Sequence, residues 1–227
     1  MSLLILGLTL LISFGAMAYL KSVYAEASQV PVVSGLTGAE TAERILQWAG
    51  IHDVEVAEGE SFLGDHYDPM EKTLVLSPEN YHGTSAAHVG VAAHECGHAM
   101  QHQHNYAPLN IRMGAVYATN FASTGVTVVA FASLFFHILS PFIALWLIAL
   151  CFAVLIFFNL ITLPVEFDAS ARAKTVLQQL GIVRAGPEAK AVSDTLFAAG
   201  LTYVAALVGT ILNFAYYFML LSGRSRN

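Results

Sequence analysis

Charged side chains are scarce in this sequence. Asp, Glu, Lys and Arg make up 11% of its 227 residues, against about 25% in soluble globular proteins, while hydrophobic residues make up 56%. Disordered chains combine low hydrophobicity with high charge, so this composition excludes a disordered protein. It also excludes an ordinary soluble globule of this size. The composition therefore predicts an integral membrane protein.

The sequence also lacks a basic cluster and has few cysteines, and each of these features excludes a class of protein. The net charge is −6 and Lys and Arg form no cluster, which excludes nucleic acid as an expected partner, since nucleic-acid binders carry a basic patch. The chain has two cysteines, Cys96 and Cys151, too few for a disulfide framework. The lipid bilayer is thus the first partner that the sequence predicts.

Apolar runs of roughly the 20 residues that a spanning helix needs occur four times. No Asp, Glu, Lys or Arg occurs from residue 113 to residue 165. This stretch is too long for one span and predicts two, which turn near residues 137–140. The predicted spans are residues 3–20, 114–136, 141–163 and 196–221.

The spans and the polar stretches between them predict a mainly α integral membrane protein, with about four transmembrane helices and a small α+β region. The segments, in order, are an N-terminal transmembrane anchor (1–21), the α+β region (22–113), a transmembrane hairpin (114–163), a polar segment (164–195), and a C-terminal transmembrane helix and tail (196–227).

The first run has a second interpretation, a cleaved signal peptide, because Ala25-Glu26-Ala27 resembles a cleavage site. No basic segment precedes the run, which favours a retained anchor. Most Lys and Arg lie between the first and second spans and between the third and fourth. The positive-inside rule therefore places both polar regions in the cytoplasm. Arg224 and Arg226, after the last span, favour the opposite orientation.

The region 22–113 combines helical and β-type patterns. Residues 37–48 predict a helix from apolar residues at helical spacing, and residues 84–104 predict a longer one. Residues 53–56 and 72–76 are short β-type runs bounded by turn residues. The 72–76 run is either a sheet edge to which an extended substrate adds as a strand, or an internal strand.

The longer helix contains the sequence His-Glu-Cys-Gly-His at 94–98. His94 and His98, at i and i+4, share a helix face about 6 Å apart along the axis, so both imidazoles can reach one metal ion. Glu95 lies roughly 100° round the helix, where it can approach a metal-bound water without being a ligand. This is the H-E-x-x-H arrangement of zinc peptidases. The alternative is a helix with two surface histidines, which the small residues around the motif disfavour.

A catalytic zinc site needs a third protein ligand. His102 lies about 12 Å from His94 along a straight helix, too far for one metal. His104 has the spacing of the longer metzincin motif, but that motif has a helix-breaking glycine where this sequence has Gln101. Glu166 is the best candidate, because an even number of predicted spans separates it from the motif and returns it to the same membrane face.

Two carboxylates of the segment after the third span keep alternative interpretations. Glu166 is either a zinc ligand or the cap of a helix that starts at Pro164. Asp168 either forms a solvated ion pair with Arg172 or accepts the second N–H of a ligating histidine.

Five blocks of the sequence resemble a known family: residues 65–69 (Asp-His-Tyr-Asp-Pro), 76–77 (Leu-Ser), 92–101 (Ala-Ala-His-Glu-Cys-Gly-His-Ala-Met-Gln), 163–170 (Leu-Pro-Val-Glu-Phe-Asp-Ala-Ser) and 201–206 (Leu-Thr-Tyr-Val-Ala-Ala). Over nearly its whole length the chain resembles the YugP-type family of bacterial membrane zinc metallopeptidases. The resemblance implies one Zn²⁺ per chain, held by His94, His98 and Glu166, with Glu95 as the catalytic base.

The chain is more distantly similar to the HtpX and Ste24 membrane proteases. Those proteins place an aspartate four residues after the glutamate ligand, where this sequence has Ser170, and its nearest aspartate is Asp168. The sequence therefore does not decide which residue supports the ligating histidine.

Together these features predict a zincin-like membrane endopeptidase of the gluzincin type, which hydrolyses a peptide or protein substrate through a zinc-bound water activated by Glu95. The expected location is a bacterial inner or cell membrane, with the active site facing the cytoplasm. The alternative is a non-catalytic zinc-binding membrane scaffold or sensor. Such a protein would need the three ligands but not Glu95, so the glutamate favours the enzyme.

Overall fold

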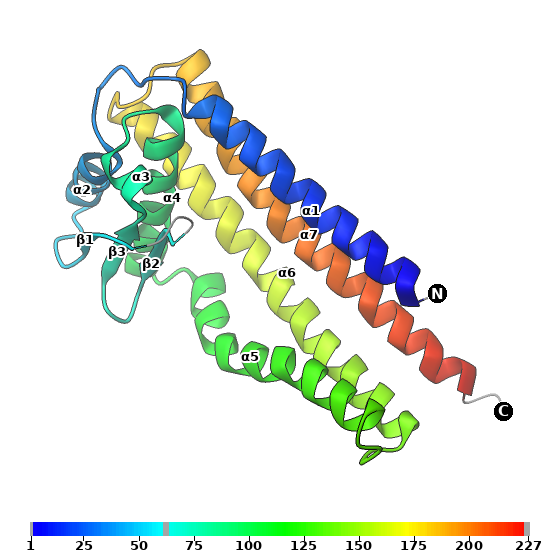
Figure 1. Ribbon diagram of the computed structural model, residues 1–227. Helices are drawn as coiled ribbons and strands as arrows, with labels where there is room; N and C mark the ends of the chain where they lie inside the picture. Colours follow the sequence, from blue (N-terminus) through cyan, green and yellow to red (C-terminus); the bar gives the residue numbers. More distant parts are fainter. Residues whose placement is uncertain (1, 61–63, 225–227) are drawn as a thin grey trace. The chain divides into compact units, whose positions relative to one another are not determined.

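The computed structural model describes residues 2–60 and 64–224, which form seven helices and three short strands. In chain order these are α1 (Ser2–Ala27), α2 (Gly38–Trp48), β1 (Glu55–Glu58), β2 (His66–Asp68), β3 (Thr73–Leu76), α3 (Pro78–His82), α4 (Ala86–Gln103), α5 (Ala107–Leu134), α6 (Pro141–Gln179) and α7 (Pro187–Arg224) (Figure 1).

The chain divides into two compact units. The spanning unit consists of Met1–Ala16, Ile111–Leu163 and Thr202–Asn227, and the motif unit consists of Met17–Asn110 and Pro164–Leu201. Helices α1, α5, α6 and α7 each contribute residues to both units. The His-Glu motif and Glu166 belong to the same unit, so the candidate site can be described within the motif unit alone.

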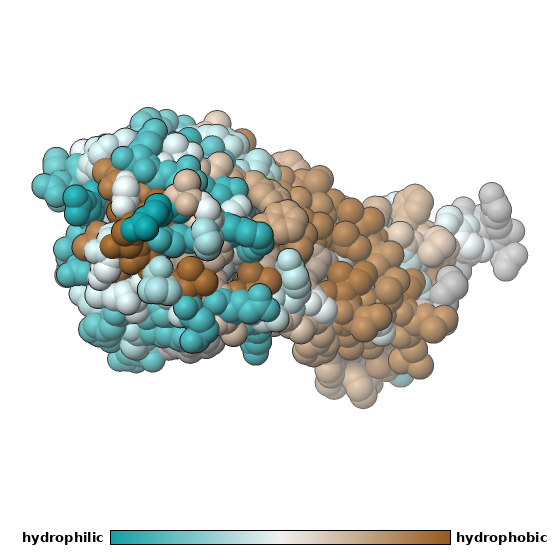
Figure 2. All heavy atoms as spheres, turned by 90° about the horizontal axis from the view of Figure 1, so that it is seen from above, coloured by the Kyte–Doolittle hydropathy of each residue, from teal (hydrophilic) through white to brown (hydrophobic). Residues whose placement is uncertain are grey.

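Four helices, α1, α5, α6 and α7, are long and apolar enough to cross a membrane. Many of their large hydrophobic side chains are exposed, among them Leu3, Tyr117 and Phe121, and Figure 2 shows hydrophobic surface along the long helices. A water-soluble protein rarely exposes so extensive an apolar surface. The expected fold class, mainly α with about four membrane-spanning helices and a small sheet, is confirmed.

Small and polar residues join the helices of the spanning unit. Gly209 of α7 faces Thr9 of α1, and a Cβ at this glycine would lie 2.8 Å from the threonine methyl. Asn159 Nδ2 of α6 donates a hydrogen bond of 3.0 Å to Thr210 Oγ1 of α7. Close approach at small residues and interhelical hydrogen bonds are the usual means of helix association in lipid.

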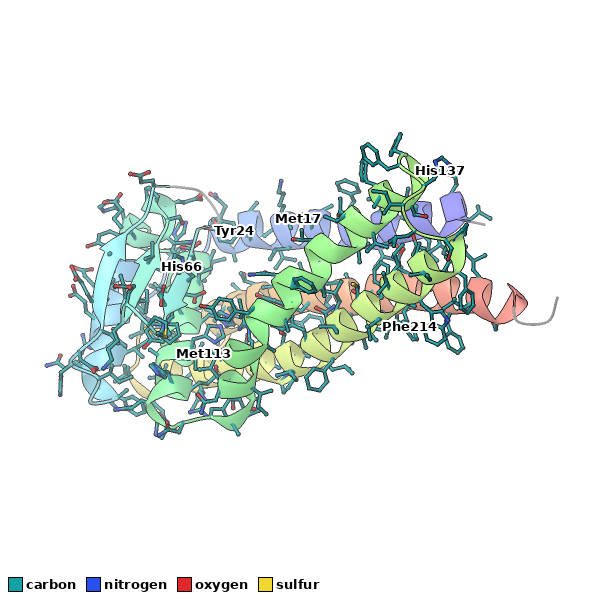
Figure 3. All side chains as sticks on the ribbon, turned by 90° about the horizontal axis from the view of Figure 1, so that it is seen from below. Met17, Tyr24, His66, Met113, His137 and Phe214 are labelled. Carbon is teal, nitrogen blue, oxygen red and sulfur yellow. The ribbon has the colours of Figure 1, made fainter. Side chains whose placement is uncertain are left out.

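His137 lies in the turn between α5 and α6 (Figure 3).

The motif unit contains a three-stranded sheet in the order β1-β3-β2. Strand β3 pairs in parallel with β1, where Val56 aligns with Leu74, and antiparallel with β2, where Tyr67 aligns with the same Leu74. Both edges of β3 are therefore occupied. The expectation that residues 72–76 offer a free edge to a substrate was wrong, and their alternative interpretation, an internal strand, is correct.

Helix α2 forms where the apolar spacing predicted it and packs on α4. Thr37 caps its N-terminus: the Thr37 side chain accepts from Glu40 N, and Glu40 Oε2 accepts from Thr37 N, a reciprocal pair that satisfies two otherwise unbonded amides. Ala42, Ile45 and Leu46 are buried on the inner face. Helix α2 therefore packs its buried face against α4, the helix that carries the His-Glu motif.

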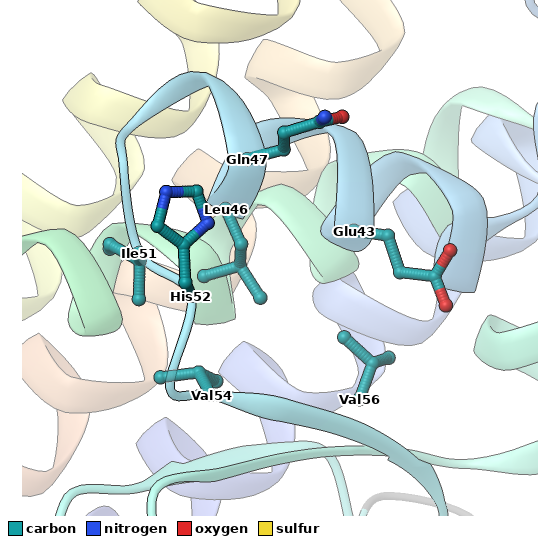
Figure 4. A pocket seen from close by; sticks show the side chains of 7 residues that line it. All are labelled: Glu43, Leu46, Gln47, Ile51, His52, Val54 and Val56. Atoms are coloured by element: carbon teal, nitrogen blue, oxygen red, sulfur yellow. The ribbon is translucent and has the colours of Figure 1, made fainter.

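An open hollow of about 200 Å³ lies beside α2 and β1 (Figure 4). It is lined by Glu43, Leu46, Gln47, Ile51, His52, Val54 and Val56. No residue of the His-Glu motif lines this hollow, so the candidate metal chemistry belongs to another part of the motif unit.

Helix α6 continues through Pro164, which lies inside it. A proline within a helix removes one backbone hydrogen bond, yet no helix begins here. The interpretation of Glu166 as a cap at a helix start was therefore wrong, because Glu166 lies in the interior of α6.

Arg226, one of the two arginines that favour the opposite membrane orientation, lies outside the described residues.

Candidate metal centre

Helix α4 forms where residues 84–104 predicted it and presents the two motif histidines on one face. Ser85 caps its N-terminus, and the helix is buried along most of its length. The imidazole rings of His94 and His98 lie with centroids 4.8 Å apart. Both rings lean from successive turns toward α6.

Glu166 of α6 completes the group. Its Oε2 atom lies 3.2 Å from His94 Nε2 and 3.7 Å from His98 Nε2, and one donor atom from each residue lies within 4.8 Å of the other two. Ligands held about 2.0–2.1 Å from a tetrahedral zinc ion lie roughly 3.4 Å from one another. Two neutral imidazoles and one carboxylate at these separations fit a Zn²⁺ ion.

The other two histidines considered as ligands have different partners. His102 Nδ1 lies 2.9 Å from the hydroxyl of Tyr67 on β2. His104 is the C-cap of α4, and its Nδ1 lies 2.7 Å from Met100 O in the preceding turn. Because α4 stays helical through Gln101, neither side chain folds back toward His94.

The surroundings of His98 favour a positive charge. Burial lowers the pKa of His98, but the close carboxylate of Glu166, the negative charge of Glu95 and the hydrogen bond to Gln101 outweigh burial and raise the pKa above its usual value. The same negative charges would stabilise a metal cation at this position. Glu95 itself is buried, with 7% of its surface exposed.

The second ring nitrogen of each histidine has a neutral partner. His94 Nδ1 lies 3.1 Å from Ser170 Oγ, and His98 Nδ1 lies 3.0 Å from Gln101 Oε1. Within the part of the chain that the structure describes, Asp168 makes no hydrogen bond to a histidine; it accepts from Gln101 Nε2 at 2.8 Å and from Arg172 Nε at 2.6 Å. Of the two interpretations of Asp168, the ion pair with Arg172 is present, and its link to a histidine runs through Gln101.

Sequence reasoning missed Gln101 and Ser170 as partners of the histidines. A signal for Ser170 was available, since it occupies the position four residues after Glu166 where the distant resemblance implied an aspartate. Gln101 was considered only as the residue at which a helix break would have to occur. Its bonds to His98 on α4 and to Val165 and Asp168 on α6 depend on how the two helices pack.

Gly97 allows α4 to approach α6 closely. A Cβ at this position would lie 2.6 Å from Ala169 O and 3.0 Å from its Cα, so a side chain would push the backbones apart. We expect Gly97→Ala to destabilise the fold by about 1–3 kcal/mol. It should also weaken zinc binding, because His98 and Glu166 lie on opposite sides of this contact. Thermal unfolding and zinc titration of the detergent-solubilised protein measure both effects.

Gly90 provides a matched control on the same helix. A Cβ there would meet Val192 Cγ1 at 3.4 Å, an ordinary contact, and alanine favours the helix by up to about 1 kcal/mol over glycine. Gly90→Ala should therefore keep both stability and zinc affinity. Equal behaviour of the two variants would show that the close approach of α4 to α6 does not shape the site.

Comparisons with known proteins agree with this geometry. Residues 2–222 match the model of a family described as "Putative neutral zinc metallopeptidase". The chain is 41% identical over 217 residues, 95% of each protein, to the "Putative membrane protease YugP" of Bacillus subtilis (strain 168). No solved structure matches.

These matches cover nearly the whole chain and confirm the resemblance that the five sequence blocks indicated. The match extends beyond the H-E-x-x-H helix to the apolar helices, so it does not rest on a short motif. The chain belongs to the family whose model is described as "Putative neutral zinc metallopeptidase", and it is a YugP-type member of it.

Proposed function

We propose that this protein is a zinc-dependent integral-membrane endopeptidase of the gluzincin type. The observation that carries the proposal is the convergence of His94, His98 and Glu166 at separations that fit one zinc ion. The ligands come from two helices, α4 and α6, that are buried against each other. Family membership and the protease name of the relative support the same conclusion.

The chemistry follows from the donor set. A zinc ion held by three protein ligands supplies a Lewis acid that polarises a peptide carbonyl and makes water nucleophilic at neutral pH. Glu95 follows His94 directly in sequence and is not one of the three converging side chains. In the proposal, its carboxylate takes a proton from the attacking water and delivers it to the amine of the leaving peptide.

A zinc-binding scaffold or sensor would have the same three ligands but would hydrolyse nothing. The deciding experiment measures the zinc content of the purified protein and its proteolysis of an unstructured protein substrate, with and without a chelator. We expect zinc in about equimolar amount, cleavage that the chelator abolishes, and recovery when zinc is returned. Zinc binding without cleavage would favour the scaffold, and cleavage that survives metal removal would contradict the proposed mechanism.

We further propose that the motif unit faces the cytoplasm of a bacterial cell, from the distribution of Lys and Arg along the chain. Glu58 is exposed at the end of β1. A cysteine at Glu58 should resist an impermeant thiol reagent in intact cells and react after lysis. Cys96 is buried and should contribute little background.

Ser140 provides the matched control for this labelling. It is exposed between α5 and α6, and the span count puts it on the membrane side opposite to the motif. Ser140→Cys should therefore react in intact cells. The reverse pattern, with position 58 labelled and position 140 protected, would place the site outside the cell.

A further inference from the structure

We infer that Gln101 is a positioning residue of the metal site. It holds His98 with Nε2 free to bind zinc, and it ties the helix of His98 to the helix of Glu166. The inference rests on the proposed zinc site but concerns a residue that lies outside the ligand set and outside the H-E-x-x-H motif.

Gln101 is completely buried, and its amide group bonds at both ends. Its Oε1 atom lies 3.0 Å from His98 Nδ1, and its Nε2 atom donates to Val165 O at 2.8 Å and to Asp168 Oδ2 at 2.8 Å. An unbonded buried amide costs roughly 1–3 kcal/mol. The three contacts satisfy this amide at both ends and give it one stable orientation.

The partners determine the direction of every bond. Val165 O is a backbone carbonyl, and Asp168 is ion-paired with Arg172, so both groups act as acceptors. The amide nitrogen of Gln101 must face them, and its oxygen must face His98. An oxygen at that place accepts a hydrogen from Nδ1. When a metal is bound, His98 therefore keeps its proton on Nδ1 and leaves Nε2 unprotonated, which is the form that binds a metal.

The same amide links the two helices that supply the ligands. Val165 directly precedes Glu166, so the bond to its carbonyl fixes the backbone of α6 next to the carboxylate ligand. Asp168 extends the link to Arg172, whose guanidinium lies 5.8 Å from the ring centroid of Tyr106. A continuous chain of bonds thus runs from His98 through Gln101 to α6.

The consequence is that zinc affinity should depend on Gln101 although it does not bind the metal. Gln101→Met keeps a similar volume but removes the acceptor and both donors. Loss of such a supporting partner typically weakens metal binding by about 10–100-fold. We expect a loss of this size for zinc, measured by competition with a chromophoric chelator. We also expect altered visible absorption bands of the Co²⁺-substituted protein, which report ligand geometry.

Gln103 provides the matched control. It lies two residues further along α4 and is exposed, and its side chain makes only a long 3.4 Å bond to Gly50 O. Gln103→Met should bind zinc as tightly as the unaltered protein and give the same Co²⁺ bands. A general effect of methionine on α4 would instead appear in both variants.

Gln101→Glu provides the second test and serves alone if Gln101→Met does not fold. A glutamate keeps the acceptor for His98 but lacks the amide hydrogens for Val165 O and Asp168. We expect shifted Co²⁺ bands and a zinc affinity between those of Gln101→Met and the unaltered protein. The inference is overturned if the folded Gln101 variants bind zinc within about threefold of the unaltered protein with unchanged bands. If the unaltered protein binds no zinc, the proposed function fails with it.

Discussion

Replacement of Glu95 by glutamine is expected to lower peptidase activity by about 10²–10⁴-fold, the usual contribution of a general base, while the purified protein keeps its zinc. Activity and zinc content should respond differently because, in the proposed mechanism, Glu95 takes a proton from the attacking water and does not bind the metal. The converging ligand group consists of His94, His98 and Glu166. Glutamine has the same size but accepts no proton at neutral pH. Steady-state cleavage and zinc analysis of one preparation measure both quantities.

Glu43→Gln makes the same chemical change at an exposed position of α2 and should leave activity and zinc content unaltered. A Glu95→Gln protein that loses its zinc would identify Glu95 as a ligand, and the assignment of roles would have to be revised. A variant that keeps both zinc and full activity would instead remove Glu95 from the mechanism.

The features that the sequence predicted are those that depend on local spacing. Helix α2 follows from its apolar period and its capping residues, and α4 from a capped run of small residues. The pairing of His94 with His98 follows from helix geometry, since residues four apart share a face. The charge-free stretch from residue 113 to 165 fixes a pair of apolar helices without any tertiary information.

The sheet was harder because strand order is a tertiary property. β2 is three residues long, too short for a period of two to distinguish it from a turn. Without β2, the 72–76 run could be taken for an edge, whereas β2 and β1 occupy both of its sides. Pro164 suggested the alternative interpretation of Glu166 as a cap, because a proline often marks a helix start, but α6 continues through it.

The supporting residues of the site lay beyond sequence reasoning for a related physical reason. Gln101 and Ser170 bond to the histidines only because Gly97 lets α4 approach α6 at Ala169. Nothing in the spacing of one helix shows which side chains of another will face it. The distant resemblance noted in the sequence pointed to position 170, but it did not indicate that Asp168 bonds to a glutamine that in turn bonds to His98.

Glu166→Ala and His104→Ala are expected to differ more than any other pair of variants. Glu166 Oε2 lies within 3.2 and 3.7 Å of the two histidine nitrogens, and its carboxylate offsets the charge of the dication. Its loss leaves two protein ligands where a catalytic zinc site has three. We expect zinc to be lost or bound much more weakly, and activity to fall to background, as measured by zinc titration and by cleavage.

His104→Ala should keep both metal and activity. His104 caps the C-terminal end of α4 and bonds back to Met100 O, so it could reach the metal only if the helix broke at Gln101. That residue is buried within a continuous helix and bonded at both ends of its amide. Retention of zinc by Glu166→Ala together with its loss from His104→Ala would mean that α4 does break there. The site would then be metzincin-like, and the convergence of Glu166 on the histidines would reflect an ion pair rather than a metal centre.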